Sequence, residues 1–465
     1  MEGATYGESV PLAGAGEAGK IVTAVANPPE PDAVRTGRRG PKQLLGATAT
    51  PGKLRLLLVG LVSLSLIWGA VAAWVVSQRA SGATDVVGTS EPLSLDGQQV
   101  YRALSDADAS AASSFLSGGL EPLAARRRYQ ADIAQAASAL ESATAAAGHS
   151  PAARDLATLS AGLPVYTGEV ETARADNRLG LPLGAAYLRE ASSLMRGTLL
   201  PAARDVSAQA NGQLSAASAR ATGLPLALVL LAAAALVGYV LFRVQRWLFR
   251  HTHRVFNPGL VVASVAAVVA LLWLVIAVGV ARADLLRARA HGSAPVAAFA
   301  QADIAALRAR ADESLTLIDA GGDDSFQADF LTVQHRLGPG LGTLLTDSVT
   351  VARGSPGASS AAAAATTATA WYGAHRTIRF LDDNGKHTQA IGLVTTPGPG
   401  HSGTLFARLD TSLTRAIAAD QAVFQSNAVA GRDAFTGLEM GVIVLALITA
   451  AGCARGINKR LAEYR

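Results

Sequence analysis

Polar side chains that could bind a ligand or a partner lie on two segments with helical spacing. Each segment combines arginines, carboxylates and an aromatic residue. A guanidinium group binds a carboxylate through two parallel hydrogen bonds, so such a set suits an amino-acid ligand or a partner protein. The alternative for each residue is a solvated helix face with surface ion pairs. The candidate binding residues are Arg127, Asp132, Tyr166, Arg174, Asp176, Asn177, Arg178, Trp371, Tyr372, Arg379, Asp382, Asp383 and Asn384.

Motifs of the common enzyme classes are missing from the sequence. The chain has no P-loop pattern, no GxGxxG opening a helix, no HExxH and no GxSxG. The eight histidines are scattered. The pair His251 and His253 has no carboxylate or cysteine close by, so it does not predict a metal site. We therefore expect a protein that is not an enzyme and that holds no cofactor and no metal.

The composition is that of a membrane protein. Half of the 465 residues are hydrophobic, only 16% are charged, and the mean hydropathy is +0.28. A soluble protein of this size is rarely so apolar. The net charge of +5 is concentrated beside apolar runs rather than on one globular face, so we expect no nucleic acid as a partner. The single cysteine, Cys453, excludes an intramolecular disulfide.

Four apolar runs are long enough to cross a bilayer, which takes roughly 20 residues. They cover residues 54–77, 224–242, 259–281 and 437–454. Soluble core helices are usually amphipathic, whereas these runs are apolar all round. They carry almost no ionisable residue, which argues against a transporter. The sequence therefore predicts an all-α membrane protein with four transmembrane helices.

Basic residues without balancing acids are concentrated on one side of these spans. By the positive-inside rule, residues 1–53, 243–258 and 455–465 lie in the cytoplasm, and residues 78–223 and 282–436 face outward. We expect a multi-pass protein of the cell membrane with both termini inside and a disordered N-terminal tail. The basic loop at 243–258 is the candidate output surface, although its arginines could instead fix topology and bind anionic lipid. These are Arg243, Arg246, Arg250 and Arg254.

The first outer segment carries helical stripes separated by turn residues. Leu156, Leu159, Leu163, Tyr166 and Val170 recur every three or four positions, and the other stripes are similar. Four helices between two spans must run up and down, so we predict a four-helix bundle in each outer segment.

The second outer segment repeats this outline. We expect helices at 295–319 and 325–337, an alanine-rich helix ending at Asp383, and a last helix running from Thr404 into the fourth span. Asn384-Gly385 could mark a hairpin turn, but its alanine-rich flank favours helix-turn-helix. Tyr166 and Tyr372 each precede an Asp-Asn pair, which suggests a duplication.

The span-bundle-span order resembles the outer sensing module of methyl-accepting chemoreceptors. The departure is that the sequence shows no HAMP linker, no long cytoplasmic coiled coil and no kinase domain. The strings FLSGGLEP, RLGLPLGAAYLREAS and RLAEYR, with four spans and two outer domains, also resemble the GlnX family of actinobacterial membrane proteins. That resemblance covers the whole chain in outline. It implies a relay between an extracytoplasmic solute-binding lipoprotein, which binds amino acids, and a cytosolic Ser/Thr kinase.

Three functions remain open at this point. The first is a non-catalytic transmembrane signal transducer that relays extracytoplasmic amino-acid availability to the kinase. The second is a direct small-molecule sensor acting through its own bundles, and the third is a scaffold of an envelope or transport complex. The expected partners are the lipoprotein, the kinase and membrane lipid, and a second copy of the chain is a further candidate.

Overall fold

The computed structural model describes residues 50–118, 121–148, 150–252, 257–319, 324–338 and 340–462. The expected N-terminal tail up to residue 49, and Arg254, lie outside these ranges. Within them every regular element is a helix. Four helices are long and apolar enough to cross a membrane. The fold is therefore that of an all-α membrane protein, as the sequence predicts.

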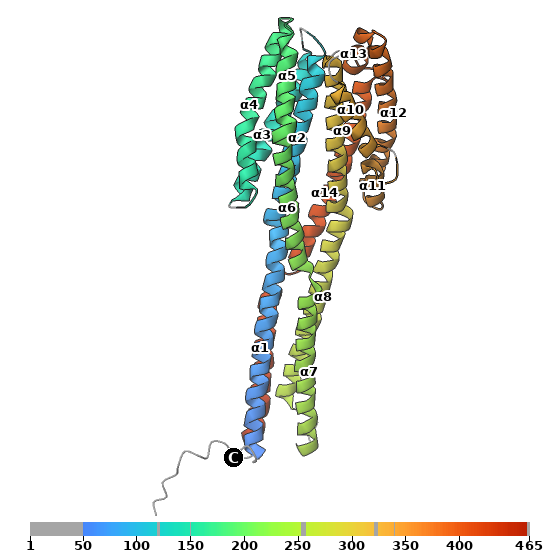
Figure 1. Cartoon of the computed structure of the whole chain (residues 1–465). Helices are drawn as coiled ribbons and strands as arrows, with labels where there is room; N and C mark the ends of the chain where they lie inside the picture. Colours follow the sequence, from blue (N-terminus) through green and yellow to red (C-terminus); the bar gives the residue numbers. More distant parts are fainter. Residues whose placement is uncertain are drawn as a thin grey trace, which may run out of the picture.

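The four membrane-spanning helices lie in the lower half of Figure 1. They contain the four predicted runs, except Gly437, and extend beyond them. Helix α15 packs on both α1 and α8, and α7 contacts the same two helices. Residues 243–252, expected in a loop, continue α7 because good helix formers follow the span without a glycine or proline. The bounds are α1 Thr50–Asp85, α7 Leu224–Thr252, α8 Pro258–Ala288 and α15 Leu438–Ala462.

Helices α8 and α15 approach backbone to backbone at the end of the bundle away from the outer domains. A Cβ atom on Gly259 would lie 2.6 Å from the Gly456 nitrogen and 2.7 Å from the Gly452 oxygen. The Asn257 side chain donates to the Gly456 carbonyl at 2.7 Å. Small residues permit this close packing where lipid supplies no hydrophobic driving force.

We expect Gly259→Val to push α8 and α15 apart and to destabilise the full-length protein by about 1–3 kcal/mol, as overpacking usually does. Denaturant unfolding in detergent micelles measures the effect. Gly279→Val is the matched control, because a Cβ on Gly279 meets nothing within 4 Å. Equal stabilities of the two variants would contradict the close approach.

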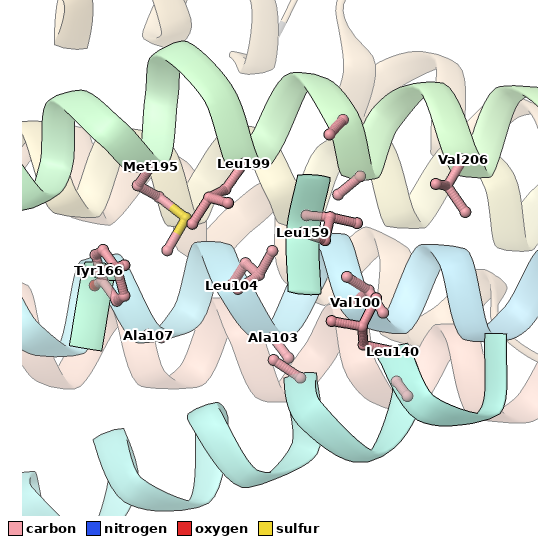
Figure 2. Packing of buried hydrophobic residues seen from close by; sticks show 14 of the residues in the cluster. Val100, Ala103, Leu104, Ala107, Leu140, Leu159, Tyr166, Met195, Leu199 and Val206 are labelled. Atoms are coloured by element: carbon pink, nitrogen blue, oxygen red, sulfur yellow. The ribbon is translucent and has the colours of Figure 1, made fainter. Parts of the chain in front are cut away.

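Residues between α1 and α7 fold into the first outer domain, a four-helix bundle in which α5, a π-helical turn and α6 form the fourth helix. Figure 2 shows its core, where Leu104, Leu140, Leu159 and Met195 come from successive helices. The predicted stripes supply most of the buried residues, since they face the bundle axis. The bounds are α2 Glu91–Phe115, α3 Leu123–Ala147, α4 Ala153–Arg178, α5 Leu183–Leu194, η2 Met195–Leu199 and α6 Leu200–Thr222.

The second outer domain departs from a simple four-helix bundle. Helices α10 and α11 together take the place of one long helix, and α13 is an additional short one. Gly385 has φ +73°, which ends α12 and gives the predicted helix-turn-helix. The expected unbroken run into the last span is wrong, because α14 ends at Asp433 and Gly437 has φ +75°. The bounds are α9 Ala294–Asp319, α10 Ser325–Leu337, α11 Leu344–Val351, α12 Ala358–Asp383, α13 His387–Thr395 and α14 Ser402–Asp433.

Matching junctions join the spans to the two outer domains. Helix α1 continues through a π-helical segment, Val86–Ser90, into α2, and α8 continues through Arg289–Ser293 into α9. The sequence repeats across these junctions at constant spacing. Arg79 matches Arg282, Pro92 matches Pro295 and Leu104 matches Leu307. This repeat supports the duplication that Tyr166 and Tyr372 suggested.

The repeated arginines meet at the break between α6 and α7. Arg79 donates to the carbonyls of Ala221, at 3.1 Å, and Gly223. Arg282 donates to the Thr222 carbonyl at 2.9 Å. The last carbonyls of a helix lack partners within the helix, and basic side chains commonly bind them. The two arginines therefore tie both continuous helices to one junction.

Candidate functional site

The two outer domains lie side by side, with α2 packed against α9 (Figure 1). Charged side chains cross this boundary, which we call the ion-pair seam. In the ion pairs that cross the boundary between the described residues of the two domains, the first domain contributes the arginines and the second contributes the aspartates. The seam comprises Arg102, Arg128, Arg189 and Arg196 with Asp303, Asp312, Asp319, Asp329 and Asp410.

Arg102 is the centre of the seam. Its Nε lies 2.5 Å from Oδ2 of Asp303, and its Nη2 lies 2.7 Å from Oδ1 of Asp410. Arg128 reaches the same Asp410 at 3.3 Å. The Asp303 side chain is fully buried, and this burial raises its pKa to about 7 although Arg102 opposes the rise. The contact between the outer domains thus depends on buried opposite charges as well as on apolar packing. Either charge would be unfavourable without its partner.

Three predicted binding residues gather at the end of the first domain away from the membrane. Arg174, Asn177 and Arg178 line a cleft of about 120 Å³ together with residues of the α2–α3 connection. The Arg174 guanidinium lies 4.0 Å from the Tyr129 ring centroid and pairs with Glu121 at 3.2 Å. The Asn177 amide donates to a backbone carbonyl of α2 at 3.0 Å.

The other predicted residues of this domain do not join that cleft. Tyr166 is completely buried in the core, and its hydroxyl has no hydrogen-bond partner among the described residues. Asp132 is also buried and accepts a hydrogen bond from Ser110 at 3.0 Å. Arg127 is exposed and Asp176 is half-buried. Tyr166 belongs to the helical stripe that faces the core of the bundle. From its spacing in the sequence alone, a core residue could not be distinguished from a binding residue.

Asp132 gives the first domain a dependence on pH. Burial, with the neighbouring Asp106, raises its pKa to about 7. The folded state therefore holds a proton that the unfolded state releases near pH 4, so this contribution to stability is lost as pH rises through about 7. We expect Asp132→Asn to remove roughly 2–4 kcal/mol of that dependence. Unfolding of the full-length protein at about pH 5 and about pH 8 tests this, and an unchanged pH slope would contradict it.

The predicted residues of the second domain form two groups. Trp371 and Tyr372 are buried in the core of this domain. Arg379 pairs with Asp382 at 2.9 Å and with Asp383 at 2.6 Å along α12. The exposed Asn384 donates to a carbonyl of the same helix. These pairs fit the alternative of a solvated helix face.

A buried polar cluster surrounds Glu313, and it was not predicted from the sequence. Its carboxylate accepts from Arg310 at 2.6 Å, Ser402 at 2.5 Å and His375 at 3.1 Å. Burial alone would raise the pKa of Glu313, but the His375 hydrogen bond and the Arg310 charge lower it to about 2. Trp371 donates to Ser402 at 2.9 Å. A sequence signal existed, since Glu313 falls on the apolar stripe of α9, where a carboxylate must be paired.

The candidate output residues lie on a helix rather than in a loop. Arg243, Arg246 and Arg250 are exposed along the last turns of α7, at the end of the bundle remote from the outer domains. Such a row of arginines can meet a partner protein or anionic lipid.

Residues 82–219 match the family model of the actinobacterial sensor domain. The matched segment begins near the end of α1 and covers nearly all of the first outer domain. The match supports a sensing role for this membrane protein. Searches of curated proteins and of solved structures give no match.

Proposed function

We propose that this protein is a non-catalytic transmembrane signal transducer. The sensor domain at residues 82–219 would receive a signal outside the cell. The observation that carries the proposal is helical continuity, since α1, Val86–Ser90 and α2 follow one another directly, as do α8, Arg289–Ser293 and α9, from the membrane to the far end of an outer domain. A helix is stiff along its axis, so a displacement of α2 against α9 shifts α1 against α8.

The ion-pair seam is the place where such a displacement would occur. Interfaces between packed helices can adopt two discrete arrangements that differ by one or two Ångström. A docked partner shifts their balance only by its differential affinity for the two. Arg79 and Arg282 would pass the change to α7, because both bind the carbonyls where α6 ends.

We propose that the outer input is a solute-binding lipoprotein that reports amino-acid availability, as the resemblance to the GlnX family implies. The far end of the first domain offers an apolar surface for it. Leu123, Leu179, Leu181 and Leu183 are between 46% and 73% exposed there. Clustered exposed apolar residues commonly mark protein interaction sites. On the inner side, we propose that Arg243, Arg246 and Arg250 contact a cytosolic Ser/Thr kinase.

Capture of the lipoprotein by full-length protein in micelles tests the input. We expect Leu179→Glu to abolish capture, because a carboxylate would have to be desolvated in the contact. Leu341→Glu is the control, since Leu341 is 99% exposed on the α10–α11 connection. Capture that survives Leu179→Glu would refute this docking surface.

A break in the helix tests the relay. Gly88 lies in the π-helical segment between α1 and α2, and a Cβ there meets nothing within 4 Å. Gly88→Pro disrupts the helix, whereas Gly88→Ala preserves it. We expect both variants to capture the lipoprotein, and only Gly88→Ala to change its kinase association in response. A full response from Gly88→Pro would refute transmission through α1 and α2.

A further inference from the structure

We propose that the cleft between the two outer domains binds a small dicarboxylate. The cleft has a volume of about 200 Å³. One wall is formed by α2, the η2 turn and α6, and the other by α9. Its charged lining residues are Asp108, Arg196, Arg204 and Arg308. The site goes beyond the proposed relay, because it gives the protein a small-molecule input that needs no protein partner.

The lining places guanidinium groups on both walls. Arg196 and Arg204 belong to the first domain, and Arg308 belongs to the second. A dicarboxylate can therefore offer one carboxylate to each wall. Guanidinium presents planar, paired donors that match carboxylate geometry. Asp108 is the one acid of the lining, and Ser192 already donates to it at 2.7 Å.

The Arg196 guanidinium group has more hydrogen-bond donors than it has acceptors among the described residues. Its Nη1 pairs with Asp312 at 2.5 Å. Its Nε and Nη2 are buried without a hydrogen-bond partner among the described residues. The Nε lies 3.8 Å from Asp108, too far for a hydrogen bond. Buried donors without acceptors are unfavourable, and a carboxylate bound in the cleft would accept hydrogen bonds from them.

The two outer arginines remain available to a ligand. Arg204 is 67% exposed and pairs with the adjacent Asp205, and Arg308 is 45% exposed and pairs with Asp329 at 3.2 Å. Exposed pairs of this kind are weak and exchange readily with a competing carboxylate. Tyr101, half-buried on the same wall as Arg204, adds a hydroxyl.

The size of the cleft limits the ligand. Pockets for drug-sized molecules hold about 300–1,000 Å³. A volume of about 200 Å³ therefore suits a compact metabolite with two carboxylates a few bonds apart. Bound between Arg204 and Arg308, it would hold α6 to α9 and stabilise one arrangement of the ion-pair seam.

Calorimetric titration of full-length protein in micelles with succinate tests the site. We expect succinate to bind, and its uncharged diamide and inorganic phosphate not to bind. Arg308→Gln and Arg204→Gln should each weaken succinate at least tenfold, because each removes a charge-assisted contact. Arg154→Gln, an exposed arginine on α4 outside the cleft, should leave binding unchanged.

Several outcomes would overturn the proposal. They are absence of succinate binding, equal binding of the diamide or of phosphate, and unchanged affinity in Arg308→Gln. Arg204 and Arg308 are exposed, so their glutamine variants should unfold at the wild-type temperature. Lipoprotein capture measured on the same samples reports on the relay independently, because its proposed surface lies at the far end of the first domain.

Discussion

Arg102→Leu is expected to destabilise the paired outer domains by about 3–5 kcal/mol, since it leaves the buried Asp303 without its cation. Asp410 loses a partner in the same step. Thermal or denaturant unfolding of the full-length protein in micelles measures the loss. Part of the cost will be relieved at low pH, because burial raises the pKa of Asp303 to about 7 and its neutral form needs no cation.

A double substitution tests the Arg102–Asp303 pair separately from the other ion pairs of the seam. Arg102→Leu with Asp303→Leu should recover most of the loss, because no uncompensated charge then remains at Asp303. Arg220→Leu is the control, since Arg220 and Asp85 form an exposed pair that should contribute about 0–1 kcal/mol. If Arg102→Leu cost no more than this control, the seam would not hold the domains together.

Glu313→Ala is expected to destabilise the second outer domain by about 3–5 kcal/mol, because Arg310 would remain buried without its carboxylate. Ser402 and His375 would also lose their acceptor. The same unfolding measurement applies, and near-ultraviolet circular dichroism, to which Trp371 contributes, reports the packing of aromatic residues. Glu313→Gln keeps an acceptor for Ser402 and should cost less than alanine.

Asp383→Ala provides the comparison for Glu313. Asp383 also pairs with an arginine on its own helix, but it is 60% exposed. We expect a change within about 0.5 kcal/mol there, as at most surface positions. Similar losses for Glu313→Ala and Asp383→Ala would contradict a special role for the buried cluster. Both carboxylates pair with an arginine on their own helix, but Glu313 is buried and Asp383 is exposed.

The ion-pair seam and the glycine contact between α8 and α15 are joined by continuous helices. The outer pairs position α2 against α9, and these helices continue into α1 and α8. At the other end, Gly259 and Gly452 hold α8 against α15 without intervening side chains. A rearrangement of the seam must therefore be accommodated along the whole length of the bundle.

The sequence alone determined the four spans and most helices of the outer domains, whereas α11 and α13 were not predicted. Apolar length identifies a span because lipid cannot satisfy an exposed backbone. Stripes such as Leu156 to Val170 identify a core face because their spacing matches the helical repeat. These features are local, so they can be read without knowing which helices become neighbours.

Only the tertiary structure decided which polar residues meet. Arg102 and Asp303 are 201 residues apart, and no local pattern links them. Most predicted binding residues occupy core or surface positions, whereas Arg196, Arg204 and Arg308 form a cleft that was not predicted. The physical reason is that a helix fixes which face a side chain occupies, while packing between distant helices fixes its partners and its burial.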